Sequence, residues 1–398
     1  MLMIIKDSYD VVIAGGGPGG SSAAKNLAEL GHSVLLLEKR QEIGAPKRCG
    51  EGLTMNTVAI IGEIPQNCIA QKIDGATLYA PNGNGVSVDL GAEGGYIVER
   101  KIFDKWLAVR ASRAGATVVA HAEVTDVLKR DGRVVGVKAL IGGEKEMEIK
   151  CMVLVAADGV ESVIARKAGL ETVNKLVNVD SGYQYEMSNL KLETDRRIIL
   201  YFGNDIAPRG YLWIFPKGPD TANVGIGTAM SEKPAKWYLD KFVEERQDIF
   251  GDASIIEANS GGIPVGGFLD NMVADGLVVV GDAAHQVNPI HGGGMKEATM
   301  AGEMAAKVIS EAIKKGDVSE KTLSEYNKIW WKERGEKLKK VEKLREVVEK
   351  LSDDDFNMLS NSLTSDVAIG LTRGSKMVSL AKILMKNPRL IKLARHLI

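Results

Sequence analysis

A glycine-rich turn between a short apolar segment and a helical segment is the feature that most restricts how this chain can fold. Residues 9–14 are mostly β-branched and apolar, and Gly15, Gly17 and Gly20 follow them at the spacing G-x-G-x-x-G. The first glycine allows a tight turn, the second lets the backbone approach a pyrophosphate, and the third lets the helix pack on the strand. The pattern predicts the start of a parallel, βαβ-type sheet.

The residues after the turn complete this unit. A helix is expected to about residue 30, where Gly31 can end it, and a second apolar strand is expected over residues 34–37. Glu38 ends that strand, where a carboxylate can accept hydrogen bonds from a ribose. A glycine-rich turn without a ligand is the alternative, and the complete context disfavours it. The segment therefore predicts a dinucleotide site.

A later segment indicates which dinucleotide is bound. Residues 277–280 read as a buried strand that ends in Gly281-Asp282, and a glycine-rich stretch then leads through Gly294 and Met295 into a helix of small residues. Asp282 can hold ribityl hydroxyls, and the first amides of that helix can stabilise negative charge on a reduced flavin. A helix-capping role is the alternative for Asp282. The combination favours FAD.

Together these segments resemble the FAD-dependent oxidoreductases of the para-hydroxybenzoate hydroxylase superfamily. The resemblance rests on the glycine turn with Glu38, on Asp158 in an Ala-Asp-Gly sequence after a predicted strand over residues 152–156, and on Gly281-Asp282. It covers roughly residues 8–310 and implies an FAD cofactor. It also implies that Arg100, which begins a predicted helix, contacts FAD; a solvated arginine at a helix start is the alternative.

Two further segments narrow the resemblance. One is Lys-Arg-Cys-Gly-Glu-Gly at residues 47–52, and the other is P-x-x-Y-x-W-x-F-P at residues 208–216. Alternate residues of a strand share one face, so Tyr211, Trp213 and Phe215 are expected to form an apolar wall suited to a hydrocarbon chain, with an ordinary core strand as the alternative. These segments resemble the geranylgeranyl reductases, which saturate isoprenoid double bonds. Within that family the chain is most similar to archaeal enzymes of membrane ether-lipid synthesis that act on digeranylgeranylglycerophospholipids.

The resemblance implies a set of FAD contacts. The matching positions are Gly19, Glu38, Cys49, Gly50, Gly52, Arg100, Val124, Asp282, Gly294 and Met295, and Gly15, Gly17, Gly20 and Asp158 complete the predicted cofactor site. Val124 falls in a predicted strand over residues 118–127, whose main-chain amides can reach an adenine. Plain sheet core is the alternative for Val124.

The implied reaction is hydride transfer from reduced flavin to one alkene carbon while a proton reaches the other. Cys49, Tyr211 or an ordered water could supply that proton, and the neighbouring Arg48 could stabilise a Cys49 thiolate. A small packing residue is the alternative for Cys49. The sequence has no second dinucleotide fingerprint, so the external electron donor could be a nicotinamide, a deazaflavin or a reduced ferredoxin.

Two other functions fit the same scaffold. An FAD-dependent aromatic hydroxylase or halogenase would need oxygen activation, and the aromatic motif and the Cys-Gly-Glu-Gly segment argue against it. A flavin-carrying electron-transfer or lipid-binding protein is the alternative without chemistry of its own.

The predicted fold class is α/β, or α+β overall: a Rossmann-like FAD-binding domain, an interleaved antiparallel-sheet substrate domain and a C-terminal helical region. Residues 1–75, 96–175 and 270–312 are assigned to the FAD domain, residues 76–95 and 176–269 to the substrate domain, and residues 313–398 to the helical region.

Composition narrows the partners and the compartment. A net charge of -1 gives no electrostatic reason to expect nucleic acid. Cys49, Cys68 and Cys151 are too widely spaced for a disulfide framework or a zinc site, so no metal is expected and a reduced cytoplasm is the expected location. The N-terminus lacks the zones of a signal peptide, and no apolar run approaches the roughly 20 residues needed to span a bilayer.

The C-terminal segment is basic and amphipathic. Residues 368–398 contain no Asp or Glu, while seven basic residues alternate with apolar ones: Arg373, Lys376, Lys382, Lys386, Arg389, Lys392 and Arg395. Such a segment can lie on anionic lipid, which predicts peripheral contact with a membrane surface. Packing against the protein itself is the alternative.

Overall fold

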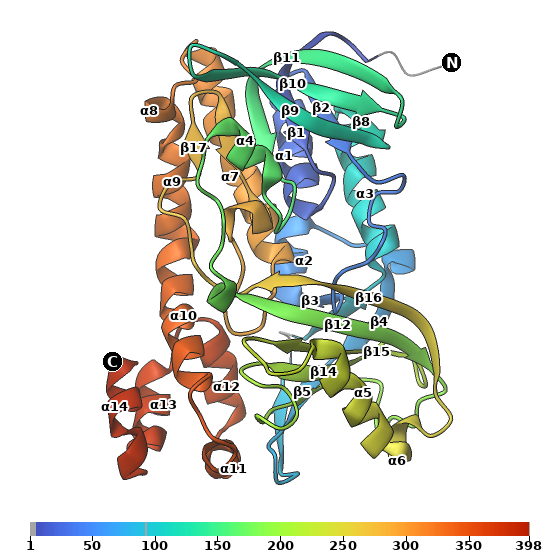
Figure 1. Cartoon of the computed structure of the whole chain (residues 1–398), viewed down its shortest axis with the longest axis vertical. Coiled ribbons are helices and arrows are strands. Elements are labelled where there is room, and N and C mark those ends of the chain that lie inside the picture. The colour runs from blue at the N-terminus through green and yellow to red at the C-terminus, as the bar shows by residue number, and fades with distance from the viewer. Residues whose placement is uncertain (1–4, 92–93, 398) are drawn as a thin grey trace.

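A largely parallel sheet forms one end of the molecule in this computed structural model, which describes residues 5–91 and 94–397 (Figure 1). Five strands lie parallel in the order β8–β2–β1–β11–β18, as expected for apolar strands that are buried on both faces. They are β1 (Ser8–Ala14), β2 (Val34–Glu38), β8 (Thr117–Ala120), β11 (Lys145–Ala156) and β18 (Leu277–Val279). The edge strand β17 (Val273–Ala274) and a meander of β9 (Ala122–Arg130) and β10 (Arg133–Ile141) pair antiparallel.

Four helices pack around this sheet. The helix α1 (Pro18–Glu29) contacts both α7 (Met295–Lys314) and α3 (Arg100–Arg113), while α4 (Val163–Ala168) packs against β9. Gly302 of α7 makes the close approach possible, because a Cβ there would lie 2.5 Å from the Gly19 carbonyl oxygen. The start of α7 is thereby held next to the glycine turn.

The single strand predicted over residues 118–127 is in fact two strands, and that prediction was wrong. His121 adopts a positive φ of 54° between β8 and β9, and its N–H donates to the Arg40 carbonyl oxygen at 2.7 Å. β8 pairs with β2 and β9 pairs with β10, so the chain changes partners at this residue.

A second, seven-stranded sheet lies at the other end of the molecule (Figure 1). Its order is β16–β12–β15–β14–β13–β5–β6, and every pair is antiparallel except β13 with β5. The strands are β5 (Gly75–Tyr79), β6 (Gly85–Asp89), β12 (Val179–Ser188), β13 (Arg197–Tyr201), β14 (Tyr211–Pro216), β15 (Ala222–Thr228) and β16 (Ser254–Pro264). One face packs on α5 (Ala235–Glu245) and α6 (Gln247–Phe250), where Leu212 and Ile214 are fully buried.

A three-stranded antiparallel sheet forms a separate unit. Its order is β3 (Gly52–Thr54), β7 (Gly95–Val98) and β4 (Ile69–Ile73), and α2 (Met55–Ile61) and the 3-10 turn η1 (Gln66–Cys68) accompany it. Its buried residues Leu53 and Val98 share a core cluster with Phe103 of α3. The sheet therefore fixes the segment that runs from the Cys-Gly-Glu-Gly sequence into α3.

Helices form the last fifth of the chain, from residue 320 onward. The elements are α8 (Glu320–Leu323), α9 (Glu325–Trp330), a π-helical turn η5 (Trp331–Gly335), α10 (Glu336–Val348), α11 (Asp353–Ser360), α12 (Ser365–Thr372), α13 (Met377–Leu384) and α14 (Ile391–His396). Short 3-10 turns are η3 (Leu176–Asn178), η4 (Gly281–Ala284) and η6 (Pro388–Leu390). Across residues 5–91 and 94–397, no helix is long and apolar enough to cross a membrane.

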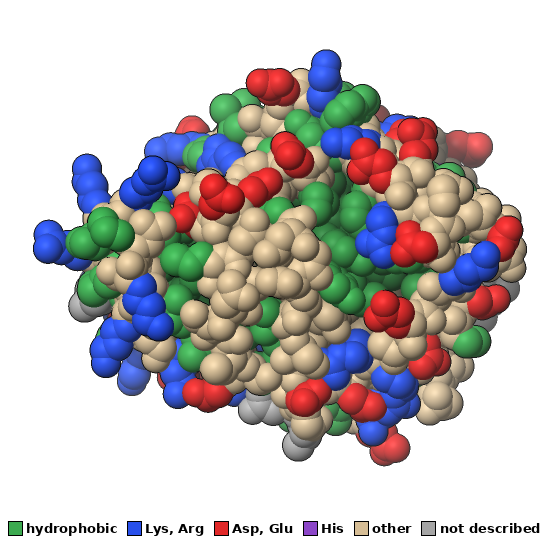
Figure 2. All heavy atoms as spheres, turned by 90° about the horizontal axis from the view of Figure 1, so that it is seen from below, with side chains coloured by type: hydrophobic (Ala, Val, Ile, Leu, Met, Phe, Trp, Pro, Cys, Tyr) green, Lys and Arg blue, Asp and Glu red, His purple; other side chains and the backbone are tan. Residues whose placement is uncertain are grey.

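Most apolar residues of the C-terminal segment pack against the protein, while Val378 and Met385 are exposed. Leu380, Leu384 and Ala394 join a buried cluster with Leu344 and Val347 of α10. The basic residues of the same segment are exposed, and Figure 2 shows Lys and Arg side chains gathered over the C-terminal helices at its left. The same view shows a hollow with apolar side chains nearer the centre and right.

Candidate active site

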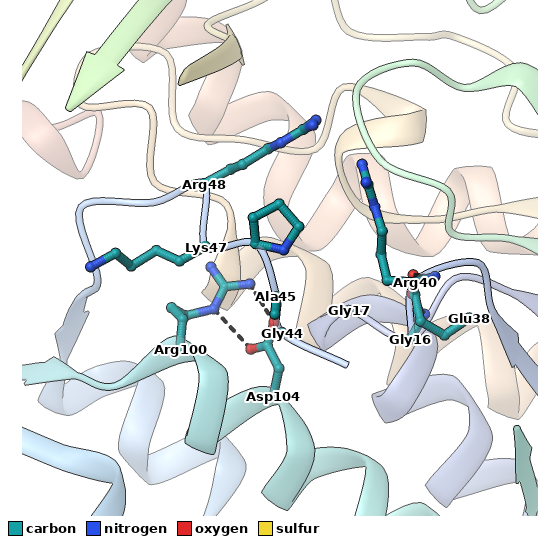
Figure 3. A pocket seen from close by; sticks show the side chains of 11 residues that line it. Gly16, Gly17, Glu38, Arg40, Gly44, Ala45, Lys47, Arg48, Arg100 and Asp104 are labelled. Carbon is teal, nitrogen blue, oxygen red and sulfur yellow. Dashed lines mark hydrogen bonds and ion pairs between the residues drawn. The ribbon is translucent and has the colours of Figure 1, made fainter. Parts of the chain in front are cut away.

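A small cavity of about 200 Å³ lies beside the glycine turn (Figure 3). Gly16, Gly17, Glu38 and Arg100 line it. The Glu38 carboxylate accepts from the amides of Gly16 at 2.8 Å and Arg40 at 2.9 Å, which fixes it at the end of β2. The cavity thus joins turn amides, a carboxylate and a cation, as a dinucleotide requires.

The glycines of the turn have different surroundings. Gly15 adopts a φ of +113°, and a Cβ there would lie 2.2 Å from the Ala157 carbonyl oxygen. A Cβ on Gly20 would lie 2.0 Å from the Gly15 carbonyl oxygen, so these two glycines permit close packing. At Gly17 a Cβ would meet no atom of the described chain within 4 Å, so its backbone is open to a ligand. Gly19 lies against Ala298 of α7.

Arg100 is fixed at the start of α3 by Asp104. Its guanidinium donates to both carboxylate oxygens of Asp104, at 2.8 and 2.7 Å (Figure 3). Burial disfavours the charged form of Arg100, but Asp104 and then Cys49 outweigh that effect and raise the pKa of Arg100 well above its ordinary value. The result is a permanent cation that lines both this cavity and a larger one.

The larger cavity has a volume of about 1060 Å³ and runs from the glycine turn to the seven-stranded sheet. Its cofactor end is lined by Asp158, Asp282, Gly294 and Met295. Asp158 Oδ2 accepts from the Ile164 amide at 2.9 Å, while within the described ranges its buried Oδ1 has no hydrogen-bond partner. Burial raises the pKa of both Asp158 and Asp282.

These features fit a flavin dinucleotide. The unpartnered Asp158 oxygen and the open backbone at Gly17 are both places where a bound ligand can complete the hydrogen bonding. Gly294 precedes α7, and a Cβ there would lie 2.8 Å from Asp282 Oδ1, so only glycine leaves room between the helix start and that carboxylate.

The segment at residues 47–52 lies between the cofactor end and the seven-stranded sheet. Cys49 Sγ accepts from the Glu51 amide at 3.2 Å, and the Cys49 carbonyl oxygen accepts from Gln184 Nε2 at 3.0 Å. Arg100, rather than the expected Arg48, is the cation beside the Cys49 sulfur, because Arg48 is turned outward toward Glu161 at 3.9 Å. The expectation that placed Arg48 at the thiol was therefore wrong.

A buried network of charges holds this segment in place. Lys217 Nζ lies 3.2 Å from Glu51, 2.8 Å from Glu99 and 3.0 Å from Glu186. Lys47 also pairs with Glu186 and lies 3.5 Å from Glu51. Asn223 Nδ2 donates to Glu51 at 2.8 Å, and Lys47 donates to Asn223 Oδ1 at 3.1 Å. Two lysines and three carboxylates thus connect the Cys49 segment to β12, β14 and β15.

The predicted aromatic wall is present on β14 and faces the larger cavity. The cavity is lined by Tyr211, Trp213 and Phe215. The ring centroids of Tyr211 and Trp213 are 5.8 Å apart, and those of Trp213 and Phe215 are 6.2 Å apart. Trp213 Nε1 donates to Gln184 Oε1 at 2.8 Å, and the Tyr211 hydroxyl donates to the His291 carbonyl oxygen at 2.8 Å. Burial raises the pKa of Tyr211 above its ordinary value, and Asp180 and Cys49 add to the effect.

The wall meets the cofactor end of the cavity at Gly50. A Cβ on Gly50 would lie 2.9 Å from Phe215 Cε2 and 3.5 Å from Trp213 Nε1. β15 pairs with the wall strand, and at Gly225 the Trp213 indole lies 2.4 Å from where a Cβ would lie. The glycine therefore accommodates the wall rather than a ligand.

The remaining predicted residues and the ones that sequence reasoning missed can now be placed. Gly52 lies next to Phe215 and lines the cavity, whereas Val124 is buried in β9 and lines neither cavity. The polar cavity residues that sequence reasoning missed include Glu51, Asp180, Gln184, Arg209, Arg345 and Glu349. Of these six, Glu51 and Arg209 lie inside the quoted Cys-Gly-Glu-Gly and P-x-x-Y-x-W-x-F-P motifs, whereas the other four lie outside any motif.

Comparison with known proteins places this geometry in a family. The chain is 42% identical to the digeranylgeranylglycerophospholipid reductase of Methanocaldococcus jannaschii, over 99% of both chains. It is 40% identical to the enzyme of the same name from Methanothrix thermoacetophila, over 98% of this chain and 99% of that one. The chain belongs to the digeranylgeranylglycerophospholipid reductase family.

Two domain-family models match separate parts of the chain. Residues 10–174 match the FAD dependent oxidoreductase family, and residues 178–263 match the geranylgeranyl reductase catalytic domain. This member of the reductase family is an FAD-dependent oxidoreductase, which confirms the predicted family, cofactor and fold class. The second match begins just before β12 and ends in β16.

Solved structures of other proteins share this fold. A geranylgeranyl bacteriochlorophyll reductase-like protein from Thermoplasma acidophilum is 34% identical, with a TM-score of 0.89 over 98% of this chain and 100% of that one. The flavin-dependent brominase Bmp2 is 22% identical, with a TM-score of 0.72 over 92% of this chain and 94% of that one. At that identity the brominase shows a shared fold alone.

Proposed function

We propose that this chain saturates the isoprenoid double bonds of geranylgeranyl chains on digeranylgeranylglycerophospholipids, in the synthesis of membrane ether lipids. The observation that carries the proposal is that the aromatic wall and the Cys49 segment bound one cavity of about 1060 Å³. An apolar chain on that wall lies at the cofactor end of the same space. Because each buried methylene contributes about 0.8 kcal/mol, a long hydrocarbon needs few polar contacts there.

The residues of the site have separate roles in such a reaction. Bound FAD in its reduced form supplies hydride. We propose that the turn amides near Gly17, together with Glu38, Arg100, Asp158 and Asp282, hold the cofactor, and that Val124 contributes main-chain contacts to it. Tyr211, Trp213 and Phe215 hold the lipid chain and exclude water from the reacting alkene. Cys49 lies between these two groups, which supports a role for its side chain next to the reacting atoms.

Cations along the cavity support a phospholipid as the carrier of the chain. Lys296, Arg334 and Lys337 line the side of the cavity next to α7 and α10. Burial, followed by repulsion from Arg334, lowers the pKa of Lys296, while Glu297, which pairs with Arg334, opposes the effect. A phosphate placed among them would relieve that repulsion.

One anaerobic experiment tests the proposal. The bound flavin is reduced chemically, a geranylgeranyl phospholipid is added, and flavin reoxidation is followed together with the mass of the lipid. Reoxidation accompanied by a gain of two hydrogens per double bond supports the function. Reduced enzyme that stays reduced with every prenyl lipid contradicts it.

We further propose that an external donor reduces the flavin. The absence of a second dinucleotide fingerprint from the sequence supports a donor that leaves after each turnover. Mixing oxidised enzyme with NADH, NADPH, a reduced deazaflavin or reduced ferredoxin, one at a time, and comparing the rates of flavin bleaching identifies the donor. Equal, slow rates with all four would contradict a specific donor.

We propose that the basic face of the C-terminal helices holds the protein at an anionic membrane by electrostatics. Lys382, Lys386 and Lys392 are exposed, while Leu384 and Leu390 between them are buried, so we propose binding by charge rather than by an inserted apolar face. A lysine near an anionic surface contributes about 1 kcal/mol. Reversing all three to Glu should weaken binding to anionic vesicles by at least about a hundredfold, whereas reversing Lys129, Lys145 and Lys150 at the other end should not. Equal flotation of the two triple-Glu variants with anionic vesicles would contradict this proposal.

A further inference from the structure

Four charged side chains come together where the larger cavity passes between β12, β14 and α10. They are Asp180 of β12, Arg209 before β14, Arg345 of α10 and Glu349 just after it, and all four line the cavity. Arg209 pairs with Glu349, and Arg345 lies 3.4 Å from Glu349 while donating to the Asn178 side chain at 2.9 Å. An apolar lipid cavity has no structural need for such a cluster.

Several atoms of this cluster are buried with their hydrogen bonding incomplete. Asp180 and Arg345 are only 8% and 7% exposed, and the Glu349 side chain is 8% exposed. Among the described residues, Asp180 Oδ1, Arg345 Nε and Glu349 Oε1 have no hydrogen-bond partner. Buried polar atoms normally find partners, so three of them in one place indicate a group that acts on something in the cavity.

Asp180 lies beside the aromatic wall. A Cβ on Gly227 would lie 3.7 Å from Asp180 Oδ2 and 3.8 Å from Trp213 Cζ3, so both side chains border that glycine. Tyr211 pairs with Gly227 in the sheet register, and Asp180 is one of the groups that raise the pKa of Tyr211. The carboxyl group is therefore next to the surface proposed to hold the alkene.

The other candidate acids are less suited to give up a proton. The Tyr211 hydroxyl already donates to the His291 carbonyl oxygen, and burial raises the pKa of Tyr211, which makes it a weaker acid than a free phenol. The Cys49 sulfur already accepts from the Glu51 amide at 3.2 Å and lies next to the Arg100 guanidinium, so two donor groups surround it. A carboxylic acid that is kept protonated by burial is the stronger donor.

We propose that Asp180 is the catalytic acid that protonates the alkene, an inference that rests on the proposed function. The π bond of the alkene breaks and its electrons form a C–H bond with the Asp180 proton at the less substituted carbon. The more substituted carbon receives the hydride that reduced FAD supplies, and FAD is left oxidised. The Asp180 carboxylate then recovers a proton from water, so the two hydrogens and two electrons added to the lipid are balanced.

The charges around Asp180 suit this role. Burial, with Glu349 next, raises the pKa of Asp180 to about 7, against the opposing effect of Arg345 and Arg209. The groups that face it are thus Glu349 and Arg345 from α10, Arg209 before β14, and Tyr211 of β14. Because the acid form is the donor, hydride transfer should slow as the pH rises through about 7.

The test is single-turnover reoxidation of the chemically reduced holoenzyme by a geranylgeranyl phospholipid, without oxygen. Asp180→Asn should slow this step at least about a hundredfold while FAD content and lipid binding stay near wild type. Asp252→Asn makes the same change at an exposed carboxylate that does not line the cavity, and this control should remain within about threefold. Glu349→Gln removes a negative neighbour, so the falling limb of its pH profile should move to lower pH.

The outcomes separate this inference from the proposed function. If wild-type enzyme never reduces the lipid, the function itself is wrong. If wild-type enzyme reacts and Asp180→Asn reacts within about threefold of it, Asp180 is not the acid. If Asp180→Asn loses FAD, the Asp180→Glu variant decides: a shifted falling limb supports the acid role, and a limb at the wild-type position overturns it.

Discussion

Replacing Lys217 with Met should destabilise the protein and loosen the segment that carries Cys49. Lys217 is 3% exposed and lies within 3.2 Å of Glu51, Glu99 and Glu186, so its loss takes a buried cation from three carboxylates, of which Glu51 and Glu186 also contact Lys47. Removing one partner of a buried ion pair costs about 3–5 kcal/mol. Because the Glu99 and Glu186 side chains keep 35% and 19% of their exposure, we expect about 3 kcal/mol, the lower end of that range.

The free energy of unfolding of the holoenzyme is measured by urea titration at a fixed excess of FAD, with circular dichroism and flavin fluorescence as probes. The double variant Lys217→Met with Glu186→Gln removes one charge of each sign, so it should lose less than the sum of the two single variants. Lys307→Met, which removes an exposed lysine, is the control and should change little. A Lys217→Met loss below about 1 kcal/mol, or strict additivity in the double variant, would refute the reasoning.

The same network has a defined pH dependence. Burial opposes the charge on Lys217, but Glu51 and the other carboxylates outweigh it and raise the pKa of Lys217 above its ordinary value. Its contribution is therefore full below the unfolded pKa of about 10.4 and declines as the pH rises beyond it. Burial also opposes the charge on Glu186, but Lys47 and Lys217 lower its pKa, so its contribution is lost as the pH falls below about 4. In Lys217→Met the alkaline decline should be smaller.

Three further sets of variants test other parts of the site. Asp282→Ala should weaken FAD binding by about 10- to 150-fold, the loss expected for a hydrogen bond to a charged group, and an unchanged Kd would show that the carboxylate does not hold FAD. Gly50→Ala should raise KM because its Cβ meets Phe215, while Gly218→Ala, whose Cβ meets no described atom within 4 Å, should not; equal effects would reject the contact. Trp213→Phe and Gln184→Ala should each slow hydride transfer, because each breaks the hydrogen-bonded link from Trp213 through Gln184 to the Cys49 carbonyl oxygen. The double variant should be no slower than the slower single variant. Additive losses in the double variant would argue against that link.

The parts of the fold that sequence reasoning predicted well are those set by local patterns. The turn at Gly15–Gly20, the strands around it and the shared face of Tyr211, Trp213 and Phe215 all depend on spacing within a few residues. Such patterns fix backbone shape and the direction of side chains without knowledge of distant partners. These local patterns also predicted the FAD cofactor, because most predicted cofactor contacts lie in a turn or at the end of a strand.

The parts that sequence reasoning missed depend on contacts between distant segments. The pairing of Lys217 with Glu51 and Glu99 and the approach of Arg345 to Asp180 each join residues more than 100 positions apart. The position of Arg100 beside Cys49, where Arg48 was expected, has the same origin. His121 is different: a single residue with positive φ, among residues that favour strands, ends one strand and begins another. The histidine side chain gives no sequence signal that would predict this turn.

The proposed function requires one cavity to bring a lipid alkene to the flavin. Its most direct test is stopped-flow mixing of anaerobic, chemically reduced enzyme with a digeranylgeranylglycerophospholipid, read by the return of oxidised-flavin absorbance and by the mass of the recovered lipid. We predict reoxidation in proportion to the lipid added, with two hydrogens gained for each flavin reoxidised. Flavin that stays reduced, or reoxidation without any gain of hydrogen by the lipid, would contradict the claim.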